Sequence, residues 1–137
     1  MLKIWNFLSD ELHNVSREIW NHPELNFEEE YAHNFLTKFL EEKGFEVERS
    51  YKGIKTAFKA TSGKGRPNVA VLCEYDALPG IGHACGHNLI SECGVGAGIA
   101  IKEVLEQNPA ISGTVNIFHL ILNSLQECVN EQFTLQY

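Results

Sequence analysis

Apolar side chains recur at helical spacing in two stretches near the start of the chain. The first stretch contains Leu8, Leu12, Val15 and Ile19. Residues spaced three and four apart lie on one face of a helix, so this stretch predicts an amphipathic helix. We expect Ser9 or Asp10 to cap its start. We expect His22–Pro23 to end it, because the residue before proline is pushed away from helical geometry.

The second stretch predicts a helix over about residues 28–43. Its helical spacing produces an aromatic stripe of Tyr31, Phe35 and Phe39. Gly44 follows directly and is placed to end the last turn, because glycine readily takes the left-handed conformation found there.

Shorter patterns predict strands in the rest of the chain. Residues 45–51 alternate between apolar and polar, which indicates a half-buried strand, and residues 56–61 predict another. Residues 69–73 are continuously apolar, which is typical of a central strand covered on both faces. A helix over residues 89–107 and an apolar strand over residues 115–122 follow. Strand, helix and strand in this order favour a parallel pair. We therefore predict an α/β fold with helices packed on a mostly parallel sheet.

Three glycines fall inside the last predicted helix, at positions 94, 96 and 98. An interior glycine costs a helix about 1 kcal/mol relative to alanine, so three of them call for a reason in the packing. We expect this helix to lie very close to the sheet or to another backbone.

The composition limits the class of protein. A chain of 137 residues with 44% hydrophobic residues is long enough for one compact domain with a core. The net charge of −7 argues against a nucleic-acid partner. No apolar run approaches the roughly 20 residues that cross a membrane, and the opening residues lack the pattern of a secretory signal. We expect a cytoplasmic protein whose cysteines are thiols or metal ligands.

Chemically active side chains are concentrated in residues 74–88, directly after the apolar strand. Cys85 and His87 carry the thiolate and imidazole groups that bind zinc, and they precede the amino end of a helix, which favours a thiolate. Glu74 and Asp76 stand at the carboxyl end of the strand, where ligands bind in open α/β sheets. Asp76 could bind a metal or orient a ligand histidine.

Other interpretations of these residue types remain open at this point. Cys85 could be a catalytic nucleophile, with His83 or His87 as its base. Cys73 and Cys93 are expected to be core residues. The remaining histidines in the predicted helices and strands are expected to lie at the surface or to be satisfied in the core, and these are His13, His33 and His119.

Three motifs, in order along the chain, resemble those of one family. The longest is residues 74–89, Glu-Tyr-Asp-Ala-Leu-Pro-Gly-Ile-Gly-His-Ala-Cys-Gly-His-Asn-Leu. The others are residues 20–29, Trp-Asn-His-Pro-Glu-Leu-Asn-Phe-Glu-Glu, and residues 53–58, Gly-Ile-Lys-Thr-Ala-Phe. Together they resemble the amidohydrolase branch of the zinc aminoacylase/carboxypeptidase family. The Glu-Tyr before Asp76 points to the Xaa-Arg dipeptidase (β-alanyl-lysine dipeptidase) group and its aminobenzoyl-glutamate hydrolase relatives.

The resemblance implies a metal-dependent hydrolase that acts on amide bonds of small dipeptides or N-acyl amino acids. A complete site of this family holds two divalent metals, usually zinc, with manganese as the alternative. Cys85 and His87 would be ligands and Asp76 a supporting carboxylate. His83 and Asn88 would shape the loop, while Glu24 would be structural.

The chain departs from the family pattern after residue 118. The Glu-Glu pair that supplies the family's general base is missing, and Glu127 is the nearest candidate. We therefore expect residues 1–118 to be the amino-terminal part of the catalytic domain and residues 119–137 to be a divergent tail. Further ligands and the dimerisation domain would be absent. The alternative to an active hydrolase is then a shortened, non-catalytic isoform, a fragment or an altered-frame product.

Overall fold

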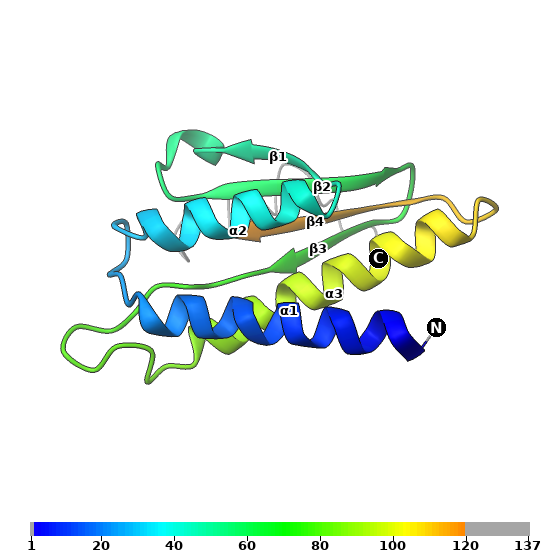
Figure 1. The fold of residues 1–137 in the computed structure, drawn as a ribbon. Coiled ribbons are helices and arrows are strands. Elements are labelled where there is room, and N and C mark those ends of the chain that lie inside the picture. Colours follow the sequence, from blue (N-terminus) through cyan, green and yellow to red (C-terminus); the bar gives the residue numbers. More distant parts are fainter. Residues whose placement is uncertain (1, 120–137) are drawn as a thin grey trace.

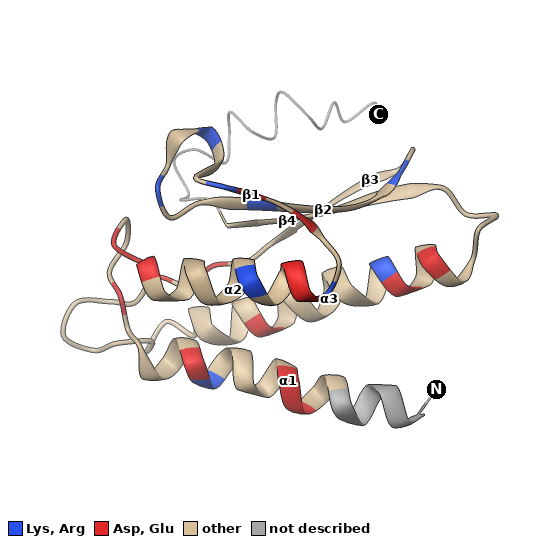
Figure 2. Ribbon diagram, turned by 45° about the horizontal axis from the view of Figure 1, so that its top comes forward, with Lys and Arg blue, Asp and Glu red and all other residues tan. Residues whose placement is uncertain are grey.

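The computed structural model describes residues 2–119, with side chains from residue 8 onward. Three α-helices cover one face of a four-stranded sheet, as Figures 1 and 2 show. In chain order the elements are α1 (Leu2–Asn21), α2 (Glu30–Glu42), β1 (Glu46–Arg49), a 3-10 turn (Tyr51–Gly53), β2 (Phe58–Lys64), β3 (Asn68–Leu72), α3 (His87–Gln107) and β4 (Gly113–His119).

The strands lie in the order β1-β2-β4-β3. As predicted, β3 and β4 are parallel and are joined through α3. The other two pairs are antiparallel, so the α/β fold is confirmed with a mixed rather than a mostly parallel sheet. Only eight residues join β1 to β2, and a parallel crossover needs a dozen or more, which explains the antiparallel start.

The strand β3 is not the covered central strand that its apolar run predicts. Within residues 2–119 it is an edge strand, paired only with β4. Val69 and Leu72 are 37% and 44% exposed. An apolar run indicates that both faces of a strand can be buried. In the described part of the chain the helices cover only one face of the sheet, and β3 has one neighbouring strand.

The first two helices differ from the sequence prediction mainly in their boundaries. Because α1 begins at Leu2, Ser9 and Asp10 lie inside it and do not cap its start. Its end at Asn21, just before His22–Pro23, is as predicted. The second helix ends as predicted, with Gly44 at φ +81°.

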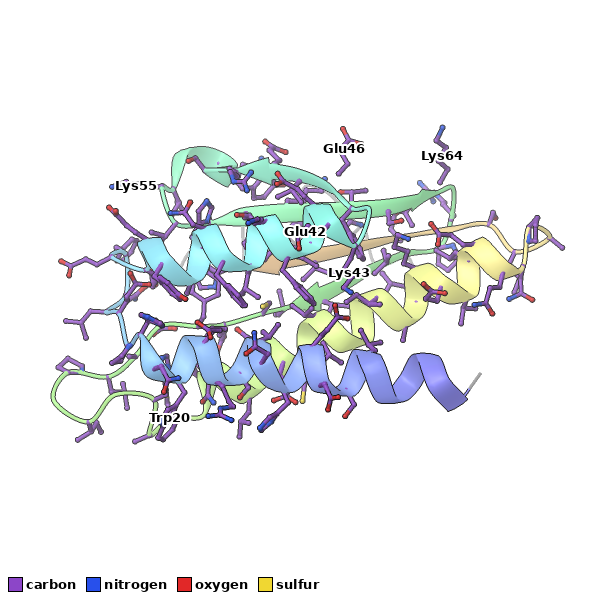
Figure 3. All side chains as sticks on the ribbon, viewed as in Figure 1. Trp20, Glu42, Lys43, Glu46, Lys55 and Lys64 are labelled. Atoms are coloured by element: carbon purple, nitrogen blue, oxygen red, sulfur yellow. The ribbon has the colours of Figure 1, made fainter. Side chains whose placement is uncertain are left out.

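The core lies between the helices and the sheet. Val15 and Ile19 of α1 and Leu36 and Leu40 of α2 are fully buried there. From the sheet side they meet Phe58, Ala60, Val115 and Ile117. The aromatic stripe of α2 is only partly buried, and its rings stack along the side of this core. Figure 3 shows that the side chains of Glu46 and Lys64 point away from it.

The glycines of α3 allow the close approach that the sequence predicts. A Cβ on Gly94 would lie 2.6 Å from the carbonyl oxygen of Leu72, and one on Gly98 would overlap the side chain of Ile117. A Cβ on Gly96 would lie 3.0 Å from Cδ1 of Leu12 in α1, a tight contact without overlap. This packing sets the first turn of α3 beside the carboxyl end of β3, where the chemically active loop begins.

Among the described residues, none of the helices has the length and apolar character needed to cross a membrane.

Candidate metal centre

In the segment that follows β3, side chains alternate between the buried core and the more exposed side of the backbone. In extended backbone successive side chains point to opposite sides. Tyr75 is fully buried, whereas the side chains of Glu74 and Asp76 are each about a quarter exposed. The two carboxylates therefore share one side of the segment, toward α3, and the tyrosine occupies the other.

His87 is the first residue of α3 and lies between these two carboxylates. Its Nδ1 donates a hydrogen bond to Oδ1 of Asp76 over 2.7 Å. Its Nε2 lies 3.3 Å from Oε2 of Glu74. A neutral imidazole that donates from Nδ1 has its lone pair on Nε2, and a lone pair facing a carboxylate is unfavourable unless a proton or a cation lies between them. The carboxylate of Glu74 therefore makes the space beside Nε2 of His87 favourable for a cation.

Cys85 lies two residues before this histidine, on the exposed side of the loop. Its thiol points to the carbonyl oxygen of Asp76, 3.8 Å from Sγ. Gly86, which precedes the helix, takes a left-handed conformation with φ +81°. Imidazole, carboxylate and thiol donors of the kind that bind zinc thus occur in one loop. Within residues 2–119, however, no three His, Cys, Asp or Glu side chains are arranged as a complete ligand set.

His83 and Asn88 flank the Cys85–His87 segment and support it in different ways. The carbonyl of His83 accepts a hydrogen bond from the N–H of Gly86, which makes the turn before α3. Its ring is buried near Trp20, with centroids 6.4 Å apart, and burial lowers the pKa of His83. Asn88 lies in α3 and donates to Oγ of Ser16 over 2.8 Å, so it joins α3 to α1.

Glu24 has the structural role that the sequence predicts. Its two carboxylate oxygens accept the backbone N–H groups of Tyr31 and Ala32, in the first turn of α2. This satisfies helix donors and places negative charge at the positive end of the helix dipole. The carbonyl of Glu24 accepts the N–H of Ala77 over 2.7 Å. The amino-terminal motif is thereby tied to the loop of residues 74–88.

Known proteins share both the sequence and the fold of this chain. The human Xaa-Arg dipeptidase is 45% identical over an alignment 109 residues long, gaps included, which covers 69% of this chain and 25% of that protein. A p-aminobenzoyl-glutamate hydrolase component of Escherichia coli is 36% identical over 86% of this chain and 29% of its own length. The chain is homologous to these hydrolases. It spans between a quarter and a third of their length. No family model matches it.

Solved structures show the same fold. The YXEP protein of Bacillus subtilis, described as a dinuclear metal binding peptidase from the M20 family, matches with a TM-score of 0.77 at 23% identity. The match covers 92% of this chain and 41% of that one. An aminobenzoyl-glutamate utilization protein from Klebsiella pneumoniae matches with a TM-score of 0.62 at 16% identity. The sequence matches confirm the predicted resemblance to the Xaa-Arg dipeptidases and aminobenzoyl-glutamate hydrolases. The structural match confirms the α/β fold class.

For this relative of the Xaa-Arg dipeptidases, the structure adds contacts that residue types alone did not reveal. Sequence reasoning placed Glu74 near the site but gave it no partner, and the structure sets it against Nε2 of His87. Ser91 was missed altogether. Its hydroxyl donates to the carbonyl of Glu74 over 2.6 Å and fixes the backbone there. The Glu-Tyr-Asp alternation after a strand is the signal that could have indicated two carboxylates on one side.

The cysteines divide differently from the prediction. Cys73 is 1% exposed, as expected of a core residue, and burial raises the pKa of its thiol to about 12. Cys93 is exposed, contrary to the prediction, because its face of α3 borders the open edge of β3. The sulfur of Cys85 faces a carbonyl while His87 is bound to carboxylates. A catalytic nucleophile would have to contact its base, and within the described residues the thiol of Cys85 makes no hydrogen bond to His83 or His87.

Two of the three remaining histidines follow the prediction, whereas Nε2 of the buried His119 has no hydrogen-bond partner among the described residues and lies 3.8 Å from Glu29. His13 is exposed on α1. His33 and His119 are buried, and each donates from Nδ1 to a backbone carbonyl, of Thr56 and Cys73 respectively. Glu127, the candidate base, lies outside the described residues, and its role stays a prediction.

Proposed function

We propose that this chain contributes part of the metal site of a hydrolase that cleaves amide bonds in dipeptides or N-acyl amino acids. The observation that carries the proposal is the placement of His87 between Asp76 and Glu74, two residues from Cys85. The names of the relatives, a dipeptidase and an aminobenzoyl-glutamate hydrolase, supply the substrate class.

Each of these residues has a distinct part in this proposal. Nε2 of His87 and the thiolate of Cys85 would bind the metal, with the carboxylate of Glu74 beside them. Asp76 holds the His87 ring through Nδ1 and keeps the lone pair on Nε2, as carboxylates do beside many metal-bound histidines. A bound divalent metal supplies polarisation of the scissile carbonyl and a water of lowered pKa. Thiolate and imidazole donors favour zinc, and manganese is better suited to carboxylates.

A second candidate is a chain that binds one metal and does not catalyse. It is favoured by the lack of a three-residue ligand set within residues 2–119. A catalytic zinc site uses three protein ligands and keeps one position open, and a hydrolase also needs a group that accepts a proton from water. Glu127 is our candidate for that group. The cytoplasmic location expected from the sequence remains part of the proposal.

Metal content and hydrolysis, measured together on the purified chain, test the two candidates. We expect about one equivalent of zinc to bind the 137-residue chain and to be lost in Cys85→Ser and in His87→Ala. The assay uses an Xaa-Arg dipeptide and p-aminobenzoyl-glutamate as substrates. Cys93→Ser is the matched control, because it removes an exposed thiol on α3 outside the loop.

The possible results separate the candidates. Hydrolysis that disappears in both loop variants and persists in Cys93→Ser establishes the hydrolase. Stoichiometric metal without hydrolysis establishes the second candidate. A wild-type chain that binds no metal would contradict both.

A further inference from the structure

The backbone of residues 73–77 is held by hydrogen bonds at Cys73, Glu74 and Ala77. The N–H of Cys73 donates to the carbonyl of Phe118, and the carbonyl of Cys73 accepts Nδ1 of His119. The carbonyl of Glu74 accepts the hydroxyl of Ser91, and the N–H of Ala77 donates to Glu24. These anchors come from β4, α3 and the loop before α2. A short segment held from three directions is suited to orient side chains accurately.

Tyr75 has the largest of the buried side chains in this segment and is fully enclosed in the core. Its hydroxyl donates to the carbonyl of Thr56 over 2.5 Å. Its ring stacks on the imidazole of His119, with centroids 3.5 Å apart and an interplanar angle of 15°. Nε2 of His119 in turn lies 3.8 Å from the buried carboxylate of Glu29. Burial keeps the pKa of Tyr75 well above its usual value, so the hydroxyl remains a donor.

We propose that Tyr75 is the positioning residue for the two carboxylates that hold His87. Glu74 and Asp76 flank it in the chain, and in extended backbone their directions are coupled to its own. A rotation of the backbone that withdrew the Tyr75 hydroxyl from Thr56 would turn both carboxylates away from the imidazole. Tyr75 touches neither His87 nor the substrate in this role. The inference rests on the proposed metal site.

A plain core role for Tyr75 makes a different prediction. If the ring served only to fill space, phenylalanine would replace it with no effect on the site. Tyr75→Phe removes the hydroxyl and keeps the ring stacked on His119. Thr37→Val is the matched control, because Thr37 is also fully buried and its hydroxyl bonds to a backbone carbonyl within α2.

The test uses Co²⁺ as the probe and reads two signals on the 137-residue chain. Absorbance from cobalt bound to thiolate gives the dissociation constant. We expect Tyr75→Phe to raise it about tenfold, the lower end of the effect of removing supporting contacts around a metal ligand, and Thr37→Val to change it less than about twofold. Without metal, the ¹⁵N shifts of the His87 ring at about pH 8 report the proton on Nδ1. We expect that proton in the wild type and in Thr37→Val, and its partial loss in Tyr75→Phe.

The two signals separate the positioning role from the proposed function. An affinity and a His87 spectrum that Tyr75→Phe leaves unchanged would overturn the role of Tyr75, even if cobalt binds. A wild-type chain that binds no cobalt would contradict the proposed function, and the metal-free spectra would still decide whether Tyr75 orients the carboxylates. Equal changes in Tyr75→Phe and Thr37→Val would indicate a loss of stability alone and would also overturn it.

Discussion

Three histidines in this chain show how the partner of one ring nitrogen decides what the other can do. His33 and His119 donate from Nδ1 to backbone carbonyls in the core. His87 donates from Nδ1 to the carboxylate of Asp76 and turns Nε2 toward Glu74. Either acceptor fixes which ring nitrogen carries the proton. His87 differs from the two core histidines in being partly exposed and in having a carboxylate beside each ring nitrogen.

At the residue scale, His33 gives the stability a defined pH dependence. Burial lowers the pKa of His33, although its hydrogen bond to Thr56 opposes the shift. Between the folded and the unfolded pKa the unfolded chain binds more protons, so stability rises with pH there. We expect the free energy of unfolding in urea to decrease as the pH falls from about 7 to about 5. His33→Gln should flatten this slope.

The control for this measurement is Thr37→Val, which alters the same helix and removes no titratable group. A slope that His33→Gln leaves unchanged would contradict the assignment. Burial alone would raise the pKa of Glu29, but its contacts with His119 and Thr56 lower the pKa below its usual value. Stability is therefore lost further as the pH falls through the pKa of folded Glu29.

At the scale of elements, α3 packs closely against the sheet because Gly94 and Gly98 have no side chains. We expect Gly98→Ala to destabilise the protein by about 1–3 kcal/mol, because a methyl group there overlaps Ile117 of β4. In an Ile117→Ala background the same change should cost much less. Thermal or urea unfolding of the four proteins of this double-mutant cycle measures the coupling. Costs that simply add would show that α3 and β4 are not in close contact at this point.

The elements themselves were largely predictable from periodicity, and their neighbours were not. The three helices and the parallel β3–β4 pair follow from spacing that is local in the chain. The edge position of β3 does not, because an apolar strand has the same sequence whether one or two strands lie beside it. The start of α1 was misplaced because Ser9 and Asp10 are also tolerated on the exposed face of a helix.

The candidate site was predictable only in part for the same reason. Cys85 and His87 could be found from residue type and spacing alone. The contacts of Glu74 and Tyr75 depend on α3, β4 and the Thr56 segment, which come together only in the fold. The sequence states which side chain stands at each position, but the residue that the side chain contacts depends on the fold.

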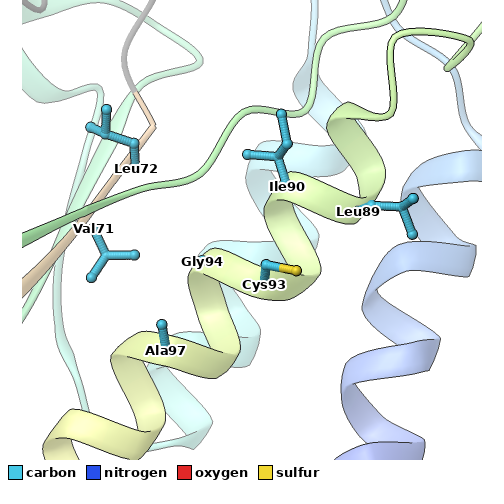
Figure 4. A pocket seen from close by; sticks show the side chains of 7 residues that line it. All are labelled: Val71, Leu72, Leu89, Ile90, Cys93, Gly94 and Ala97. Atoms are coloured by element: carbon cyan, nitrogen blue, oxygen red, sulfur yellow. The ribbon is translucent and has the colours of Figure 1, made fainter.

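At the scale of the whole molecule, the two edges of the described sheet differ in charge. The outer strand β1 carries Glu46, Glu48 and Arg49, the charged protection common on natural edge strands. The opposite edge, β3, has no charged residue. Figure 2 shows charged residues on β1 and on all three helices. Figure 4 shows the apolar groove beside β3, lined by Val71, Leu72, Leu89, Ile90, Cys93, Gly94 and Ala97.

We expect this chain to self-associate through the β3 edge in a concentration-dependent way. Leu72→Lys places a charge in the groove and should shift the species seen by sedimentation velocity toward the monomer. Asn14→Lys, on the exposed face of α1, makes the same change in net charge and serves as the control. A wild-type chain that is monomeric at all concentrations, or an equal response of the two variants, would contradict this expectation.

The alternation of Glu74, Tyr75 and Asp76 also limits how this stretch can change in evolution. A substitution alters one side chain and leaves its neighbours facing as before. An insertion or deletion of a single residue between β3 and Asp76 would reverse the facing of everything beyond it, because the extended backbone has a period of two. Carboxylates would then be directed at the core and the tyrosine at solvent. Length in this stretch is therefore constrained more tightly than composition, and only changes of two residues would keep its register.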